Sequence, residues 1–306
     1  MPSLHRGYRE SSRSQREWEL VKRSLAALGT LGLATAAWGH FEAGWVRLRT
    51  LEVLVPGMPV ELSGLRIVHL SDFHLGFPSR GEHAVHRAVH WAGAREPDLT
   101  LITGDLLSRP SAEPRLRRLL GELPNAFAVL GNHDFAITRD PFSKLSAVLE
   151  LDSTELLLDE ARTIELRGRR VQVVGVDPRT YQRGRTQPER LADPEADLRI
   201  LLCHFTNVTD KLPTGVFDLV LAGHLHGGQI CLPYGRAKKL RLAHLRWTYA
   251  EGLYRRPGGV LHVSPGLGTT FVPFRFFARP EATELTLVGP GPRARDSRKM
   301  LRAFRD

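Results

Sequence analysis

Short apolar runs that each end in a polar, turn-prone cluster dominate this chain from about residue 65 onward. Several runs are apolar throughout, which is typical of strands covered on both faces. Segments suited to helices lie between them, so the alternation predicts a layered α/β or α+β domain. We expect strands at 65–70, 99–103, 126–130, 171–176, 200–203, 219–222, 260–264 and 283–288, and helices at 82–95, 113–122 and 141–150.

Composition narrows the class of protein. With 42% hydrophobic and 25% charged residues over 306 positions, the chain can bury a substantial core and does not resemble a disordered, collagen-like or polytopic membrane protein. Its two cysteines, Cys203 and Cys231, exclude a disulfide scaffold and a four-thiolate zinc site. Oxygen and imidazole groups would therefore have to bind any metal.

The formal net charge of +10 is concentrated at the two ends of the chain. Residues 1–49 carry eight Lys or Arg against four Glu, and residues 290–306 carry six against two Asp. The body between them is nearly neutral, which does not suit a nucleic-acid-binding groove. We therefore expect a membrane surface, and no nucleic acid, as a partner.

The N-terminal region predicts membrane association. A basic, polar stretch, 1–23, precedes an apolar segment, 24–41, that we interpret as an anchor helix or uncleaved signal segment. Its charge-free run, 24–39, is shorter than the roughly 20 residues that cross a bilayer. A cleaved signal peptide and a buried Ala/Leu helix are the alternatives, and the side of the membrane stays open. At the C-terminal end, we expect residues 289–306 to form a basic mobile tail or a short surface helix.

Candidate metal ligands follow the predicted strands. Asp72 and His74 come after the first, and residues two apart in an extended chain project to the same side. Asp105 follows the second strand, and Asn132 follows the third, with His133 pointing elsewhere in an extended segment. Open α/β sheets bind ligands at the carboxyl ends of their strands, so these side chains are candidates for one site.

Three histidines extend this set after later strands. His204 follows the run at 200–203, while His224 and His226 follow the run at 219–222 with the same alternate spacing as the first pair. Any one of them alone would more often be an ordinary core or surface histidine. The ordered set of Asp, Asn and His after successive strands instead predicts a metal centre.

The motifs SDFHLG, GDLL, GNHD, CHF and GHLHGGQ, in this order, resemble the signature of calcineurin-like metallophosphoesterases. The resemblance covers about 50–288. It implies a four-layer α/β/β/α sandwich with two divalent metal ions at the sheet edge. Carried over position by position, it implies one metal bound by Asp72, His74 and His226, a second bound by Asn132, His204 and His224, and Asp105 bridging both.

The resemblance also implies a reaction. Two metal ions activate a water for in-line attack at phosphorus, and Mn, Fe or Zn would suit this mixed oxygen and imidazole donor set. His133 would steady the phosphoryl group or protonate the leaving oxygen, so we predict that it is catalytic. Asp134 is expected either to orient His133 or to be an ordinary loop carboxylate.

The segment after the last histidines resembles a bacterial, membrane-associated branch of the family. Some related proteins cleave UDP-diacylglucosamine, so the resemblance implies a phosphorylated, lipid-linked or envelope substrate. A soluble nucleotide phosphodiesterase or protein phosphatase is the alternative within enzymes. A metal-free binding scaffold of the same fold is a further one, which the complete set of ligands disfavours.

Two further segments are candidates for substrate contacts. Lys238, Lys239 and Arg241 lie in a basic and apolar stretch, 236–247, that could hold an anionic head group or could be a solvated basic helix face. Arg275 is a candidate phosphate contact. It lies in 271–277, an aromatic run that could form a wall for acyl chains or a core strand.

Overall fold

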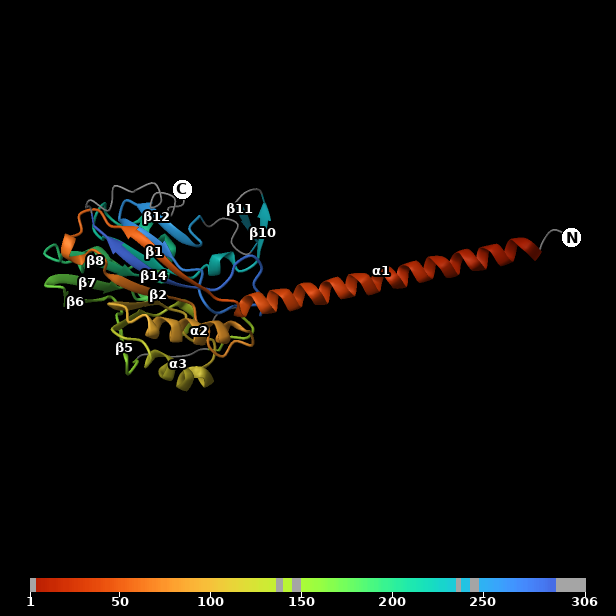
Figure 1. Ribbon diagram of the computed structural model, residues 1–306, viewed down its shortest axis with the longest axis horizontal. Helices are drawn as coiled ribbons and strands as arrows, with labels where there is room; N and C mark the ends of the chain where they lie inside the picture. The colour runs from red at the N-terminus through yellow and green to blue at the C-terminus, as the bar shows by residue number, and fades with distance from the viewer. Residues whose placement is uncertain (1–3, 136–139, 145–149, 235–237, 243–247, 290–306) are drawn as a thin grey trace.

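Two six-stranded sheets that pack face to face form the body of the protein (Figure 1). The computed structural model describes residues 4–135, 140–144, 150–234, 238–242 and 248–289. The first sheet has the order β1-β14-β2-β3-β4-β5, with β1 Arg47–Leu54, β14 Glu281–Val288, β2 Arg66–Leu70, β3 Leu99–Thr103, β4 Ala126–Val129 and β5 Thr154–Leu156. β14 is antiparallel to β2, and the other neighbouring pairs are parallel.

The second sheet has the order β12-β13-β9-β8-β7-β6, with β12 Gly252–Arg256, β13 Gly259–Val263, β9 Leu219–Ala222, β8 Leu198–Leu202, β7 Arg169–Gly175 and β6 Glu160–Leu166. Its four central strands are parallel, and its two edge strands are antiparallel to their neighbours. A separate hairpin pairs β10 Cys231–Tyr234 with β11 Lys238–Arg241.

Apolar side chains explain the layering. Ile67 and Leu101 of the first sheet and Val173 and Ile200 of the second belong to one buried cluster between the sheets. On the outer face of the first sheet lie α2 Gly81–Ala94 and α3 Glu113–Leu120, whose buried residues recur at helical spacing. The outer face of the second sheet is covered by α4 Pro178–Gln182 and short 3-10 turns. The predicted four-layer α/β/β/α sandwich is confirmed, with a thin fourth layer.

The predicted elements compare well with the observed ones. All eight expected strands are present with ends within two residues, and the first two expected helices correspond to α2 and α3. The third expected helix, 141–150, is wrong where the structure describes it: residues 141–144 form a turn and 150 is not helical, while 145–149 lie outside the described residues. The expected tail, 289–306, lies outside them apart from Gly289. Sequence analysis missed β6, because this edge strand is mostly exposed and carries no apolar run.

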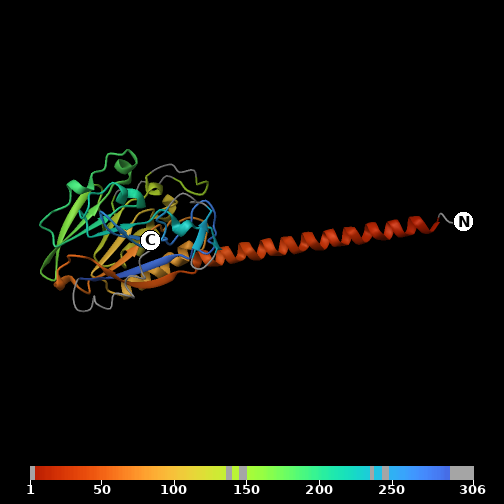
Figure 2. The same ribbon diagram turned by 90° about the horizontal axis from the view of Figure 1, so that it is seen from above.

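The N-terminal helix, α1 Leu4–Gly44, projects away from the two sheets as a single rod (Figures 1 and 2). The leucines of its apolar stretch are exposed, with Leu33 at 76% and Leu25 at 63%. The alternative of a buried Ala/Leu helix is therefore wrong. Among the described helices, none is both long and apolar enough to cross a membrane.

The C-terminal end of α1 is attached firmly to the body. Glu42 is 3% exposed and accepts hydrogen bonds from the Ala278 backbone N–H (2.9 Å) and from the Trp38 indole (3.2 Å). Gly39 lies directly against the ring of Phe276, so a side chain at this position would displace the ring. These contacts fix the end of the helix beside the loop that precedes β14.

Candidate metal centre

The predicted ligands meet at one edge of the sandwich. Because β2, β3 and β4 are parallel, the loops that follow them emerge together, and the loops after β8 and β9 of the second sheet emerge beside them. Two groups of potential ligand atoms converge there within 4.8 Å: Asp72, His74, Asp105 and His226 form one, and Asp105, His204 and His224 form the other.

Asp105 belongs to both groups. Its Oδ2 lies 3.4 Å from Nε2 of His74 and 3.3 Å from Nε2 of His204. Its Oδ1 accepts a hydrogen bond from the backbone N–H of His133 at 2.8 Å, which fixes the orientation of the carboxylate. One carboxylate oxygen therefore lies between the two groups.

Asn132 completes the second group. Its Oδ1 lies 3.2 Å from Nε2 of His204, and the same nitrogen lies 3.0 Å from Nδ1 of His224. All seven side chains expected at the site are therefore next to one another. Five of them are buried, while Asn132 and His224 are half-buried and give the site its opening.

Residues behind the ligands orient the histidine rings. Nδ1 of His204 lies 2.7 Å from the Thr103 carbonyl, and Nδ1 of His74 lies 3.1 Å from the Ser108 hydroxyl. A ring N–H that donates to a carbonyl leaves the opposite nitrogen, Nε2, as an electron-pair donor. The sequence analysis missed Thr103 and Ser108, because a strand carbonyl and a lone serine carry no motif.

The electrostatics favour a cation. Burial opposes a charge on His204, yet Asp105 and Asp72 raise the pKa of this histidine to about 9. Burial also opposes ionisation of Asp105, but His204 and His133 hold the pKa of this carboxyl well below its usual range. Burial and the neighbouring His74 lower the pKa of His226 well below its usual range, so its imidazole is neutral, the form that binds metals.

The donor set fits a dinuclear divalent metal site. Two buried carboxylates, an amide oxygen and four imidazoles converge in two groups that share Asp105. Several of their donor nitrogens lie close to one another, as in the 3.2 Å approach of Nε2 of His74 to Nε2 of His226. A bound cation would give such nitrogens a common partner.

The backbone at the ligands differs from the extended chain assumed above. Asp72, His74, His224 and His226 have positive φ angles of 53°, 46°, 77° and 49°. The third motif forms a 3-10 turn, Asn132–Asp134. The expectation of alternate side chains on an extended strand is therefore wrong, although both pairs still face one centre.

His133 lies beside the ligands. Its ring stacks edge-to-face on that of His74, with centroids 4.7 Å apart, and its Nδ1 lies 3.3 Å from the hydroxyl of Ser143. Ser143 in turn donates to Asp140 at 3.0 Å. Neither Ser143 nor Asp140 was among the site residues expected from the sequence.

Asp134 has a different position from the one expected of an orienting partner. Its carboxylate accepts the backbone N–H groups of Leu106, Leu107 and Gly131 at 2.8 to 3.0 Å. Burial and the nearby Asp105 raise the pKa of Asp134 to about 7. Asp134 therefore ties the second motif loop to the third.

Arg275 is fully buried, and its guanidinium donates to the carbonyl oxygens of Gly268, Pro265, Ala278 and His226. These hydrogen bonds hold the loop that carries His226. The surroundings of Arg275 therefore do not match the phosphate contact that we expected.

The basic segment forms strand β11 where it is described, so the alternative of a solvated basic helix face is wrong there. Lys239 pairs with Glu251 at 3.1 Å, and Arg241 packs over Gly228 beside the last ligand motif. Residues 236, 237 and 243–247 of the segment lie outside the described part of the chain.

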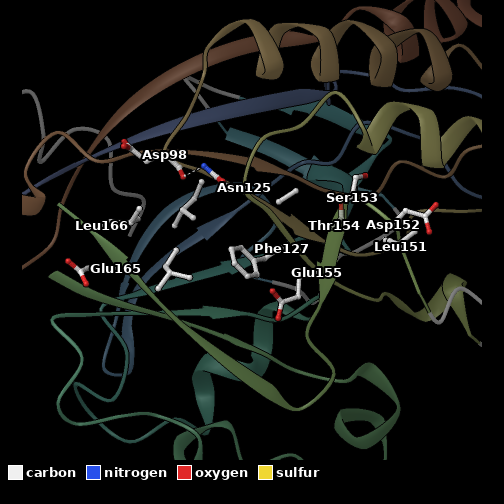
Figure 3. Close-up of a pocket in the computed structure, with 13 residues that line it drawn as sticks. Asp98, Asn125, Phe127, Leu151, Asp152, Ser153, Thr154, Glu155, Glu165 and Leu166 are labelled. Atoms are coloured by element: carbon white, nitrogen blue, oxygen red, sulfur yellow. Dashed lines mark hydrogen bonds between the residues drawn. The ribbon is translucent and has the colours of Figure 1, made fainter. Parts of the chain in front are cut away.

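A pocket of about 560 Å³ lies far from these ligands, at the amino-terminal ends of β3, β4 and β5 (Figure 3). Leu99, Phe127 and Leu166 line it together with acidic residues such as Asp98 and Glu165. None of the metal-ligand candidates contributes to it, so this pocket is separate from the candidate metal centre.

Comparison with known proteins agrees with the geometry. Residues 65–228 match the family model of calcineurin-like phosphoesterases. The uncharacterised metallophosphoesterase YkoQ of Bacillus subtilis is 31% identical over 235 residues, which cover 74% of this chain and 84% of that protein. The chain therefore belongs to the calcineurin-like phosphoesterase family, as the motifs indicated, and is a hydrolase that acts on phosphoester bonds.

Two further relatives carry more specific names. A transmembrane protein with metallophosphoesterase domain from Danio rerio is 30% identical over 302 residues, covering 90% of this chain and 64% of that protein. The UDP-2,3-diacylglucosamine pyrophosphatase LpxG of Chlamydia muridarum is 26% identical over 314 residues, covering 84% of this chain and 94% of that protein.

Proposed function

We propose that the chain is a dinuclear metal-dependent phosphohydrolase of a lipid-linked or envelope substrate. One metal is held by Asp72, His74 and His226, the other by Asn132, His204 and His224, and Asp105 bridges them. The observation that carries this proposal is the pair of ligand groups that share one buried carboxylate. Mn, Fe and Zn all suit the donors.

The residues of the site have separate roles in this reaction. Bound divalent ions supply an activated water and bind phosphate oxygens. His133, beside but outside the ligand groups, contacts the phosphoryl group or hands a proton to the leaving oxygen. Ser143 and Asp140 hold the Nδ1 edge of this ring and so fix its orientation beside His74.

The lipid-linked substrate class has two supports. The relative named as a UDP-2,3-diacylglucosamine pyrophosphatase is similar over most of both chains. The exposed leucines of α1 also suit association with a membrane, as does the name of the transmembrane relative. Lys238 and Arg241, close in the chain to the ligand motif, are the candidates for contact with an anionic head group.

A substrate screen tests this proposal. Purified protein loaded separately with Mn, Fe or Zn is offered a lipid-linked phosphoanhydride, a soluble aryl phosphate, a cyclic nucleotide and a phosphopeptide. We expect the lipid-linked anhydride to be turned over with the highest kcat/KM. Preference for the nucleotide or the phosphopeptide would favour the soluble phosphodiesterase or protein phosphatase instead.

Asp105→Asn tests the dinuclear centre itself. An amide keeps the size of the side chain but supplies a weaker, neutral ligand, so elemental analysis should show loss of both metals together with activity. Asp98→Asn, at the pocket on the opposite edge, is the matched control. If Asp105→Asn retained both metals and normal turnover, the shared-carboxylate assignment would be refuted.

A further inference from the structure

The β10–β11 hairpin carries an uncovered apolar face. Leu232 of β10 pairs directly with Leu240 of β11, so their side chains lie on the same face of the ribbon. Tyr234 and Leu242, each two residues further along, continue that face. The four side chains are 43 to 56% exposed. We call these four residues the hairpin face.

The opposite side of the hairpin is fastened to the metal-binding loop. Cys231 is buried with its Sγ 3.3 Å from the Gly227 carbonyl, and Lys239 forms its ion pair with the buried Glu251. The Arg241 side chain packs where a Cβ on Gly228 would be. The hairpin is therefore held by its inner side, and its apolar residues point away from the body.

The β10–β11 hairpin lies at the end of the molecule from which α1 projects (Figures 1 and 2). Phe276 connects the two: its ring contacts Gly39 of α1, and its carbonyl accepts the Cys231 N–H at 2.9 Å. The neighbouring Phe271 and Phe277 are 49% and 48% exposed. Exposed apolar side chains thus continue from the helix, across this loop, to the hairpin.

The charge balance of the surrounding sequence favours an anionic partner. The sequence 219–250 holds five Lys or Arg and no acidic residue; of these, Lys239 and Arg241 lie on the inner side of the hairpin. Lys22 and Arg23 precede the apolar stretch of α1, at the end of that stretch distant from the hairpin. Contiguous apolar patches with cationic neighbours are typical of surfaces that insert at the head-group boundary of anionic membranes.

We propose that the hairpin face inserts into the surface of an anionic bilayer as a second contact beside α1. This inference deepens the proposed function, on which it rests: His226 precedes β10 by five residues, so an inserted hairpin would hold the metal centre at the membrane surface, where a lipid head group is presented. A water-soluble substrate would gain nothing from this arrangement.

Single-cysteine labelling tests the contact in the full-length chain. Both native cysteines are buried, so Leu240→Cys can be labelled selectively with an environment-sensitive dye. Val60→Cys is the matched control, because Val60 is 72% exposed on the turn Val60–Leu62 at the opposite edge of the sheet. With vesicles of equal parts phosphatidylcholine and phosphatidylglycerol, we expect the dye at 240 to shift to the blue and to lose access to iodide, and the dye at 60 to do neither.

Two results would overturn the proposal. If the protein sediments with the vesicles while the dye at 240 remains open to iodide, α1 alone makes the contact. If the blue shift occurs without vesicles and grows with protein concentration, a second copy of the chain covers the hairpin face.

A double variant adds a functional measurement. Leu240→Ser with Leu242→Ser should lower hydrolysis of a membrane-embedded substrate about tenfold or more, since two leucines lose their burial, and should leave hydrolysis of a soluble aryl phosphate unchanged. Val60→Ser should change neither. Equal rates of the double variant and the wild type on the membrane-embedded substrate would count against insertion. If the metal-loaded wild type hydrolysed no phosphoester at all, the proposed function would be refuted, but the result of the dye experiment would still hold.

Discussion

Replacing Arg275 by Met should destabilise the fold strongly. The side chain is fully buried and donates to four backbone carbonyl oxygens, at 2.9 Å for Pro265 and Ala278 and 2.6 Å for Gly268. Burial lowers its pKa to about 10, so it is still charged at neutral pH. Met has nearly the same volume and length, so the variant removes the donors without opening a large cavity.

The expected magnitude follows from the partners left behind. A buried acceptor left without its donor costs about 1–3 kcal/mol, so the loss of the donors to four buried carbonyls should cost several kcal/mol. Since a domain is stable by roughly 5–15 kcal/mol, this loss is a large fraction of the total. Arg275→Lys keeps the charge but has fewer hydrogen-bond donors. Its free energy of unfolding should therefore lie between those of the wild type and Arg275→Met.

Urea unfolding followed by circular dichroism, in the presence of a chelator, measures this loss without a contribution from metal binding. Arg185→Met is the control, because Arg185 is exposed and its replacement should change the free energy of unfolding by less than about 0.5 kcal/mol. An Arg275→Met variant within about 1 kcal/mol of wild type would show that the four carbonyls find other partners, and the structural role assigned to Arg275 would be wrong.

Three further predictions concern the site, the core and the helix. His133→Ala should lower kcat on an aryl phosphate roughly 100-fold or more while elemental analysis finds both metals; unchanged kcat would remove its catalytic role. Burial, reinforced by Arg49, lowers the pKa of His262 to about 3, so the unfolded chain binds its proton first as the pH falls. The free energy of unfolding should therefore decrease as the pH falls below about 6.5, by about 2 kcal/mol at pH 5. In urea titrations, His262→Gln should show a weaker dependence of this free energy on pH. A dependence parallel to that of the wild type would contradict the prediction. Deleting residues 1–36, which keeps Glu42 in place, should move active enzyme toward the soluble fraction; wild type already soluble without detergent would argue against the tether.

Much of the fold could be predicted because its central strands are buried on both faces. The strand β9, Leu219–Ala222, is fully buried, and its sequence is the continuous apolar run typical of a strand covered on both faces. The strands that escaped prediction lie at edges or in the hairpin, where one side faces water and polar residues interrupt the run. Their pairing depends on neighbours distant in the sequence, which local patterns do not reveal.

The types and order of the ligands were also readable from the sequence, but not the residues that orient them. Ser143 follows His133 by ten positions, and its contact depends on the turn that Asp140 begins. From the sequence, Arg275 is a candidate phosphate contact in an aromatic run. Only the fold shows that backbone carbonyls from two other segments, at His226 and at Pro265 and Gly268, surround it.

The backbone at the ligands shows why local reasoning reached the right residues through the wrong geometry. Asp105, like both ligand pairs, has a positive φ, 53°, in the left-handed region that side chains other than glycine enter at a cost of order 1–3 kcal/mol. Such a conformation persists only where other contacts enforce it. Asp134 supplies one by accepting the N–H groups that follow Asp105, and Gly131 supplies another, because a Cβ there would collide with the Asp105 carboxylate. The glycines and the additional Asp of these motifs therefore stabilise the backbone turn at the end of each strand. These turns direct the polar side chains of the motifs toward one centre.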